Sequence, residues 1–499
     1  MAAGEFLSPV SDAVLSIEPA KPARAARGLR FFRASFAHAA EGADVVILLF
    51  ALWATVKTLI QDSFLSASLA QTLPAATACA VLWWAMREAD VYRFSARSQV
   101  GGHMLKLAGA LVLGGLAGAA MGALAALPSA RPVEEGVEES VLALGFAAAL
   151  LVPAHLIYAS LLGALTRAGH FALNVVVVGA TDAARGLIER NARSGDLNVL
   201  GVFDDRLSRA PTSLAGAPVL GDLDALLSWP QLPTVDRVIV AVSKASQDRT
   251  RVLIDRLRAL PNKVVLLFDM DGLGTGPSTL AQVADAPAAY VSGAPENARR
   301  VFWKRVQDVV IGSIALAVFS PLMLIVALAI KLDSRGPVFF RQARHGANNE
   351  IIRVWKFRSM RVETTDHKAE RQVTAGDPRV TRVGRIIRKT SIDELPQLFN
   401  VLAGEMSLVG PRPHAVGMKT GDVESEKLVA EYAHRHRIKP GMTGWAQIHG
   451  SRGPVNTAED VAERVRYDVE YIERANFWLD VWIMAATIPC LIGDTRAIR

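Results

Sequence analysis

The run Asn174-Val-Val-Val-Val-Gly179 is the point at which the chain changes from long apolar segments to short apolar runs. Four consecutive valines followed by a glycine are typical of a strand buried on both faces of a parallel sheet. A helical stretch follows to about Asn191, and further strand-like runs occur at 200–203, 237–242 and 263–269. Strands that alternate with helices predict a Rossmann-like α/β domain over 169–270, with a parallel, doubly wound sheet.

The turn after the valine run is a weak match to a dinucleotide-binding fingerprint. Gly179 occupies the first glycine position, but Thr181 stands where close approach of a pyrophosphate requires a second glycine. Asp204 or Asp205 lies about where a ribose-binding acid would, although an acid pair that ends a strand is also ordinary turn chemistry. We therefore expect no NAD, and favour a cofactor-less regulatory or dimerising domain over a dehydrogenase.

Four apolar segments precede this domain, and each is long enough to cross a bilayer. They cover 43–62, 67–86, 107–127 and 141–166. The content of hydrophobic residues is 51%, which is high for a soluble protein. The pattern predicts a disordered basic arm over 1–40 and a four-helix transmembrane bundle over 41–168.

Basic and acidic loops alternate between these segments. The loop 87–106 contains Arg87, Arg93, Arg97 and Lys106, whereas the loop after the third segment contains four glutamates. The positive-inside rule then places the N-terminus and everything after Arg167 in the cytoplasm.

Two features inside the apolar segments have open interpretations. Gly114, Gly118 and Gly122 form a small-residue ridge, which suits either packing within the bundle or a homodimer. His155 is the one group of the fourth segment that can become charged near neutral pH, and we expect its hydrogen bonds to be satisfied within the bundle, without a functional role.

Residues 271–298 are rich in glycine, proline and alanine and predict a linker. The apolar stretch that follows, within 304–331, is long enough for a fifth span but has basic residues at both ends. Ser320-Pro321 lies near its middle, where a proline breaks a helix. We predict a re-entrant helix that enters one leaflet, breaks at Ser320-Pro321 and leaves on the same side; the alternative is an ordinary span with a kink.

Charge and cysteine usage exclude several classes. The net charge of +7 arises from basic residues beside apolar segments, without a nucleic-acid-binding signature, so membrane lipid is a better partner than nucleic acid. The chain contains two cysteines, Cys79 and Cys490, which provide neither a disulfide framework nor a cysteine zinc site.

The acid pair Asp393-Glu394 directly follows a strongly basic stretch. Clustered arginines favour phosphate, and an ionised aspartate beside them can act as a nucleophile. The pair belongs to a series of motifs that occur in the order Gly336-Pro-Val-Phe-Phe-Arg-Gln342, Trp355-Lys-Phe-Arg-Ser-Met360, Asp377-Pro-Arg379, Arg388-Lys-Thr-Ser-Ile-Asp-Glu-Leu-Pro-Gln397, Gly404-Glu-Met-Ser-Leu-Val-Gly-Pro-Arg-Pro413 and Pro440-Gly-Met-Thr-Gly-Trp-Ala-Gln447.

This series resembles the bacterial sugar transferase family, the monotopic phosphoglycosyl transferases that start exopolysaccharide and O-antigen synthesis on a polyprenyl-phosphate carrier. The resemblance covers 299–499 and extends loosely to the whole chain, because the large subclass carries a four-span bundle and a Rossmann-like domain before a mixed α/β monotopic catalytic domain. It implies transfer of a sugar-1-phosphate from a UDP-sugar to undecaprenyl phosphate, with release of UMP, at the cytoplasmic face of the bacterial inner membrane.

The resemblance also implies roles for individual residues. Asp393 matches the family nucleophile, which would form an aspartyl phospho-sugar, and Glu394 matches the adjacent acid that positions or deprotonates the acceptor phosphate. Arg388 matches the phosphate-binding arginine, and Arg412 matches the motif associated with the nucleotide donor. A divalent ion, usually Mg²⁺, would bind Asp393 and substrate oxygens.

Other residues near the motifs have weaker predictions. Lys356 and Arg358 are expected to complete the basic pocket, and Arg437 is a substrate-contact candidate by location. We expect three arginines to form a basic helical ridge that faces the membrane: Arg379, Arg382 and Arg385. Three histidines are expected to be surface or structural residues: His434, His436 and His449.

The identity of the sugar is not readable from the sequence, and a UDP-hexose is the expectation by family habit. Two other functions remain open. One is a membrane-anchored nucleotide-sugar dehydrogenase or epimerase that uses 173–269, which Thr181 disfavours. The other is a non-catalytic membrane scaffold, which the intact pair Asp393-Glu394 disfavours.

Overall fold

The chain folds into two compact units, one over residues 30–171 and one from Ala172 onward. The computed structural model describes residues 33–59, 69–92, 100–129, 132–167, 170–195, 197–206, 211–241, 247–267, 281–283, 286–293, 297–361, 377–420, 423–451, 453 and 455–493. The basic arm predicted over 1–40 lies outside this part of the chain up to residue 32.

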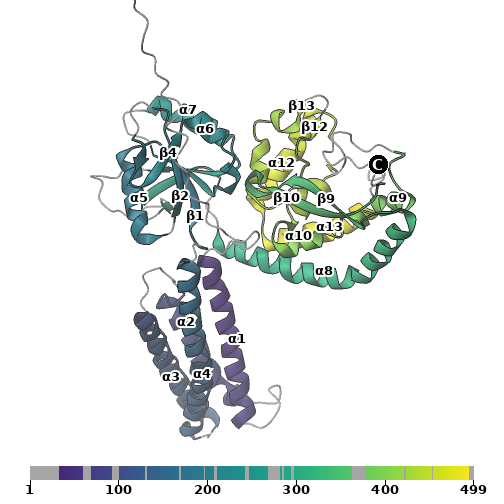
Figure 1. Cartoon of the computed structure of the whole chain (residues 1–499). Helices are drawn as coiled ribbons and strands as arrows, with labels where there is room; N and C mark the ends of the chain where they lie inside the picture. Colours follow the sequence, from purple (N-terminus) through teal and green to yellow (C-terminus); the bar gives the residue numbers. More distant parts are fainter. Residues whose placement is uncertain are drawn as a thin grey trace, which may run out of the picture. The chain divides into compact units, whose positions relative to one another are not determined.

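The first unit is a bundle of long helices that lie side by side in Figure 1. Its elements are α1 (Arg33–Leu59), α2 (Leu69–Glu88), α3 (Val100–Ser129) and α4 (Val133–Arg167). Leu82 and Met86 of α2 are fully buried among the other helices, whereas Leu116 of α3 and Ile157 of α4 are more than half exposed. Apolar side chains that point outward are what a bundle surrounded by lipid requires.

By length and composition, four described helices could cross a membrane: α1, α3, α4 and a later helix, α8. The second predicted span corresponds to α2, which packs in the bundle but is not one of these four. Gln71, Thr72 and Pro74 lower the hydropathy of α2, and the neighbouring helices cover much of it. Its role as a span stays a prediction.

The glycine ridge of α3 serves packing within the bundle. A Cβ atom on Gly114 would lie 2.8 Å from the carbonyl oxygen of Ala78 in α2, and one on Gly136 of α4 would lie 2.5 Å from Cα of Gly122. Contacts this short leave no room for any side chain, so the three helices approach backbone to backbone. Of the two interpretations left open by the sequence, the intra-bundle one accounts for these contacts.

The second unit begins with a mixed sheet whose strand order is β3-β4-β2-β1-β5-β6-β8-β7. Its central strands, β4, β2, β1, β5 and β6, pair in parallel. The strands are β1 (Leu173–Val178), β2 (Leu197–Phe203), β3 (Ser213–Leu214), β4 (Ala217–Gly221), β5 (Arg237–Val240), β6 (Lys263–Leu267), β7 (Ala281–Val283) and β8 (Ala286–Ser292).

Helices cover both faces of this sheet. Val175 and Val177 of β1 pack with Leu187 of α5 (Asp182–Ser194) on one face. Val176 and Val178 pack on the other face in a cluster that includes residues of α6 (Leu223–Leu227) and α7 (Gln247–Arg258). Burial on both sides explains why the sequence shows an unbroken valine run rather than alternation.

The prediction of a linker over 271–298 is corrected, because part of its described residues forms a strand of the sheet. Ala286–Ser292 forms β8, which pairs antiparallel with β6, and Ala288 is fully buried. Alanine fits the narrow space under an edge of the sheet, although its low strand propensity hid the strand in the sequence. The α/β domain therefore extends to Ser292, beyond the predicted end at 270.

The apolar stretch after it is one continuous helix, α8 (Ala298–Asp333), with Pro321 inside it. The expected interruption at Ser320-Pro321 is not present; Figure 1 shows α8 bending as an arc instead. Proline removes a single backbone donor, and the Ser320 hydroxyl donates to the carbonyl of Ala317 (2.9 Å) within the same turn. The path of α8 relative to a membrane stays a prediction.

The remaining residues build a small mixed α/β fold above α8 (Figure 1). Arg305 of α8 donates to the carbonyls of Val401 and Leu402, and Asp308 accepts from the Leu408 amide (3.0 Å). The main elements are β9 (Phe339–His345), β10 (Ile351–Phe357), α9 (Arg382–Lys389), α10 (Gln397–Ala403), β11 (Ser407–Val409), β14 (Gly441–Thr443), α11 (Trp445–Ile448), α12 (Ala458–Arg474) and α13 (Phe477–Gly493).

The close approach of α3 and α4 generates a stability prediction. Gly136→Val should destabilise the bundle by about 1–3 kcal/mol, because the new side chain would overlap the backbone of Gly122. Gly145→Val is the matched control on the same helix, since no atom lies within 4 Å of a Cβ at Gly145. Thermal unfolding of the full chain in detergent measures both, and equal melting temperatures would contradict the packing.

Candidate active site

Asp393 and Glu394 lie in a short 3-10 turn, Ile392–Glu394, between α9 and α10. Ser391 begins the turn in the left-handed region with φ 55°, which costs a non-glycine residue about 1–2 kcal/mol. Pro396 follows as the N-cap of α10, and its ring holds φ at −62°, which suits the entry to a helix. The turn therefore places the two adjacent carboxylates at the junction between α9 and α10.

Two cations from distant segments hold Glu394. Lys356 Nζ of β10 lies 2.8 Å from Glu394 Oε1, and Arg412, which follows β11, places Nη2 2.6 Å from the same oxygen. Arg412 Nη1 also reaches Glu394 Oε2 at 3.2 Å, so this arginine binds the carboxylate with both arms. Glu394 is the junction of β10, the 3-10 turn and the segment after β11.

The pKa values of the two carboxylates shift in opposite directions. Burial raises the pKa of Asp393 to about 6; the charge of Glu394 adds to the rise, and Lys356, Arg388 and Arg412 oppose it. Burial also acts to raise the pKa of Glu394, but Arg412 and Lys356 outweigh it and hold that pKa well below its usual value. Near neutral pH both groups are ionised, and Asp393 is the more basic of the two.

A further cation at this site, Arg344, was missed by the sequence interpretation. It lies on β9, donates to Gln342 Oε1 (2.7 Å) and to the carbonyl of Pro413, and is close enough to Asp393 and Glu394 for both to act on it. Burial, together with the charge of Arg412, lowers the pKa of Arg344 to about 10. The sequence feature that could have identified Arg344 is the alternation of side chains along β9, which puts residues 342 and 344 on the same face of the strand.

Comparisons with known proteins identify the family of the chain. A family model described as bacterial sugar transferase matches residues 299–494. Over 400 residues the chain is 36% identical to the UDP-glucose:undecaprenyl-phosphate glucose-1-phosphate transferase of Xanthomonas campestris pv. campestris, an alignment that covers 78% of this chain and 81% of that protein. The chain belongs to the bacterial sugar transferase family.

Other relatives of this sugar transferase are named for the same donor or for a different one. The enzyme of the same name from Escherichia coli (strain K12) is 37% identical over 328 residues, covering 65% of this chain and 69% of that protein. A UDP-N-acetylgalactosamine-undecaprenyl-phosphate N-acetylgalactosaminephosphotransferase from Aeromonas hydrophila is 44% identical over 191 residues, covering 38% and 44%. A second family model, for a CoA-binding domain, matches residues 89–267.

The turn after β1 of this sugar transferase does not fit a phosphate-bearing group such as coenzyme A. Related α/β domains bind phosphates with the free amides of this turn and of the next helix. Here the Ala180 amide donates to Asp204 Oδ2 (2.6 Å), and the Ala184 amide donates to Thr181 Oγ1 (3.3 Å). Asp182 adds a second carboxylate in the first turn of α5. Occupied amides and negative charge both oppose phosphate at this position.

The structure brings Lys356, Arg412 and Arg388 to the acid pair but not Arg358. The Arg358 guanidinium donates to the carbonyls of Arg335 (2.8 Å) and Ser334 (2.7 Å), at the C-terminal end of α8. This corrects the prediction that Arg358 lines the pocket. Arg358 lies just beyond β10, where the chain turns toward α8, and the negative end of that helix attracts it.

Two further expectations need revision. Arg379 precedes α9 and pairs with Asp377 (2.6 Å), so it does not continue the exposed row of Arg382 and Arg385. Hydrogen bonds from Arg379 lower the pKa of Asp377 to about 2. Arg437 donates to Ser292 Oγ (2.6 Å) rather than extending toward the acid pair.

A buried network supports the backbone of the Arg412 segment. Arg435 is fully buried, pairs with Asp468 (2.7 Å) and donates to the Arg412 carbonyl (2.8 Å). It also contacts the imidazole of His414 at 2.7 Å, and burial, followed by the charges of Arg435 and Arg464, holds the pKa of His414 well below its usual value. The network fixes the direction from which Arg412 approaches Glu394.

Removal of the Glu394 charge should destabilise the fold, because Lys356 and Arg412 would then repel each other. Their side chains are only 15% and 24% exposed, so we expect Glu394→Gln to cost about 1–3 kcal/mol. Glu424→Gln is the control; it breaks an exposed pair with Lys427 and should cost at most about 0.5 kcal/mol. Chemical unfolding of both variants measures the difference, and an equal loss would count against the arrangement.

Proposed function

We propose that this enzyme is a polyprenyl-phosphate hexose-1-phosphate transferase. It moves a sugar-1-phosphate from a UDP-sugar to undecaprenyl phosphate and releases UMP, as the first membrane step of exopolysaccharide, O-antigen or capsule synthesis. The observation that carries the proposal is Asp393 beside a Glu394 that Arg412 and Lys356 hold in place. The names of its relatives support the same donor and acceptor classes.

In the first step, an oxygen of ionised Asp393 attacks the phosphorus that carries the sugar. The bond from that phosphorus to the bridging oxygen breaks, and UMP leaves with the bridging oxygen, so that the enzyme carries an aspartyl phospho-sugar. The carboxylate of Asp393 accepts no hydrogen bond within the described residues, which leaves both oxygens available. Arg412, Lys356 and Arg344 are positioned to offset the charge of the departing nucleotide.

In the second step, a phosphate oxygen of undecaprenyl phosphate attacks the same phosphorus and releases Asp393. A carboxylate whose pKa lies well below normal is a weak base, which favours a positioning role for Glu394 over proton abstraction. Arg388, in the last turn of α9, is near enough to affect the pKa of Asp393 and would bind the incoming phosphate.

A divalent cation such as Mg²⁺ is part of the proposal. Within the described residues no group of three or more His, Cys, Asp or Glu is arranged to hold a metal by itself. The donor set here, one aspartate carboxylate together with substrate phosphate oxygens, is the kind that Mg²⁺ commonly uses. When bound, the cation would neutralise the diphosphate, and Asp393 would be its protein ligand.

The membrane arrangement is proposed on the same grounds. The apolar side chains of α8 and the tryptophans Trp478 and Trp482 of α13 are exposed, which suits contact with lipid. Basic residues at both ends of α8 favour a re-entrant path, so that the catalytic domain stays on the cytoplasmic face of the inner membrane. We assign the Rossmann-like α/β domain a regulatory or dimerising role without NAD.

Replacement of the nucleophile tests the reaction directly. Asp393→Asn should lower UMP release by at least about a thousandfold, because an amide cannot form the aspartyl phospho-sugar. The control is Asp224→Asn, whose side chain is 75% exposed on the α/β domain. The assay uses a panel of UDP-sugars with undecaprenyl phosphate in lipid nanodiscs; wild-type turnover by Asp393→Asn would exclude the proposed intermediate.

The pKa of Asp393 predicts the acid limb of the pH profile. Since the nucleophile must be ionised and its pKa is about 6, kcat/KM should fall about tenfold per pH unit below that value. Among the charges that lower this pKa, Lys356 ranks first, so Lys356→Met should move the limb to higher pH. Lys427→Met, at a lysine 73% exposed, should leave the limb in place. A limb that moved to lower pH in Lys356→Met would reverse the assignment.

A further inference from the structure

The helical bundle contains a buried chain of ionisable side chains that the proposed reaction does not use. His155 Nε2 of α4 lies 3.0 Å from Asp44 Oδ2 of α1, and both side chains are fully buried. His155 Nδ1 lies 2.8 Å from Nε2 of His103 on α3, and the Tyr158 hydroxyl donates to Asp44 Oδ1 (3.3 Å). Three helices therefore supply one continuous chain, Asp44–His155–His103.

With Asp44 ionised and both imidazoles neutral, the geometry fixes where the protons lie. A carboxylate only accepts, so His155 Nε2 must donate to Asp44. In a neutral imidazole the other nitrogen, Nδ1, then accepts, and His103 Nε2 must donate to it. Each member of the chain thus orients the next, and a proton added at His103 can pass along these hydrogen bonds toward Asp44.

Within the described part of the bundle, the surrounding charges do not neutralise Asp44. Arg87 of α2 is engaged by Glu41 at 3.3 Å, and His38 approaches the other oxygen of the same Glu41. Lys106 of α3 is exposed, and within the described part of the bundle no lysine or arginine forms an ion pair with Asp44. Besides Tyr158, the Tyr92 ring lies 6.3 Å from the His155 ring, and it carries no charge at neutral pH.

An isolated carboxylate is costly inside a bundle that lipid surrounds, and a bound proton removes that cost. We propose that the Asp44–His155–His103 chain is a proton-binding site, which at neutral pH holds one proton more than an ionised carboxylate and two neutral imidazoles. The proton comes from water and resides either on an imidazole, as an ion pair with Asp44, or on the carboxyl itself.

The chain is suited to a proton rather than to a metal ion. Both nitrogens of His155 already bind protein partners, one on each side, so the three residues form a line instead of converging on one point. His103 is 9% exposed and lies in the first turn of α3, whereas Asp44 and His155 are fully buried. His103 is therefore the end at which a proton enters.

The test detects the proton on the full chain in lipid nanodiscs at neutral pH. Nitrogen-15 NMR of histidine-labelled protein reports whether His103 or His155 is an imidazolium, with signals assigned by His103→Gln and His155→Gln. Infrared spectroscopy reports a protonated carboxyl, assigned by its loss in Asp44→Asn. We expect one of these two signatures, in one copy per molecule; two neutral imidazoles with an ionised Asp44 would overturn the proposal.

Two comparisons sharpen the result. Glu138→Gln removes an exposed carboxylate from the same helix as His155 and should leave both spectra unchanged. His103→Phe keeps a ring at the entrance but removes its nitrogens, and should slow deuterium exchange of the bound proton at least about tenfold. The wild-type spectra alone decide the proposal if a variant does not fold, and they require no substrate, so the outcome is independent of the proposed reaction.

Discussion

The carboxylate of Glu394 is the contact on which the catalytic unit depends, because it joins three segments that are distant in the sequence. Lys356 comes from β10 and Arg412 follows β11, and the two like charges can lie together only with a negative group between them. Behind Arg412, fully buried Arg435 holds the backbone through the Arg412 carbonyl. The position of Asp393 and its raised pKa follow from this framework.

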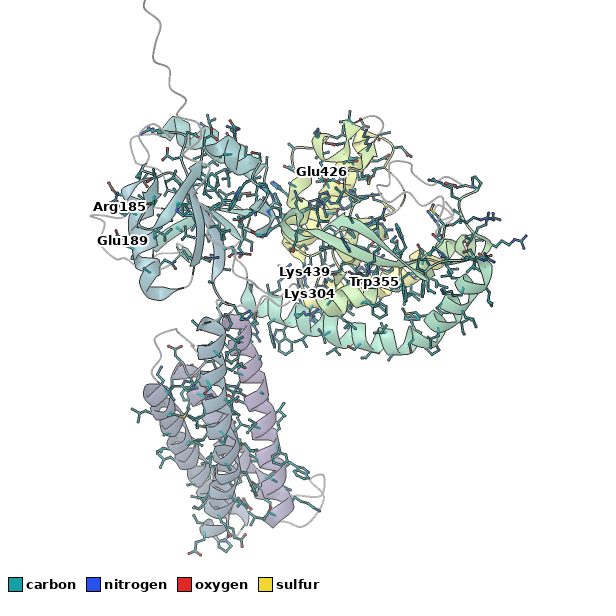
Figure 2. All side chains as sticks on the ribbon, viewed as in Figure 1. Arg185, Glu189, Lys304, Trp355, Glu426 and Lys439 are labelled. Atoms are coloured by element: carbon teal, nitrogen blue, oxygen red, sulfur yellow. The ribbon has the colours of Figure 1, made fainter. Side chains whose placement is uncertain are left out.

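The same unit must stay attached to an apolar helix, and polar residues at the beginning of α8 provide the attachment. Lys304, labelled in Figure 2, lies 2.7 Å from Asp480 of α13, while Asp308 accepts from Ser407 and Leu408 of β11. In the sequence these charges look like interruptions of a membrane segment. In the structure they connect α8 to the strand that precedes Arg412, so the helix with exposed apolar side chains and the residues proposed to bind phosphate form one piece.

Sequence patterns located the elements and motifs that local spacing encodes. They missed side-chain contacts that depend on residues far away in the sequence. The valine run, the apolar helices and the acid pair were readable because periodicity and motif order are local properties. In the sequence, Arg358 and Lys356 were equivalent candidates for the basic pocket. In the structure, Arg358 lies beyond β10 and its guanidinium points toward the end of α8. The expectation that His155 is hydrogen-bonded within the bundle is confirmed, but its partner Asp44 is 111 residues away and could not be identified from local spacing. The strand β8 was hidden because alanine has a low strand propensity.

The charge balance of the site constrains what Glu394 can do when a donor arrives. Arg344, Lys356 and Arg412 surround two carboxylates, so the site carries an excess of positive charge before any phosphate binds. A diphosphate that enters must share Arg412 and Lys356 with Glu394, because both cations already bind that carboxylate. Glu394 therefore keeps the two cations together and correctly placed in the absence of substrate, which limits the reorganisation that binding would otherwise require. A role of this kind needs an ionised, weakly basic carboxylate, and that is the state the two cations impose.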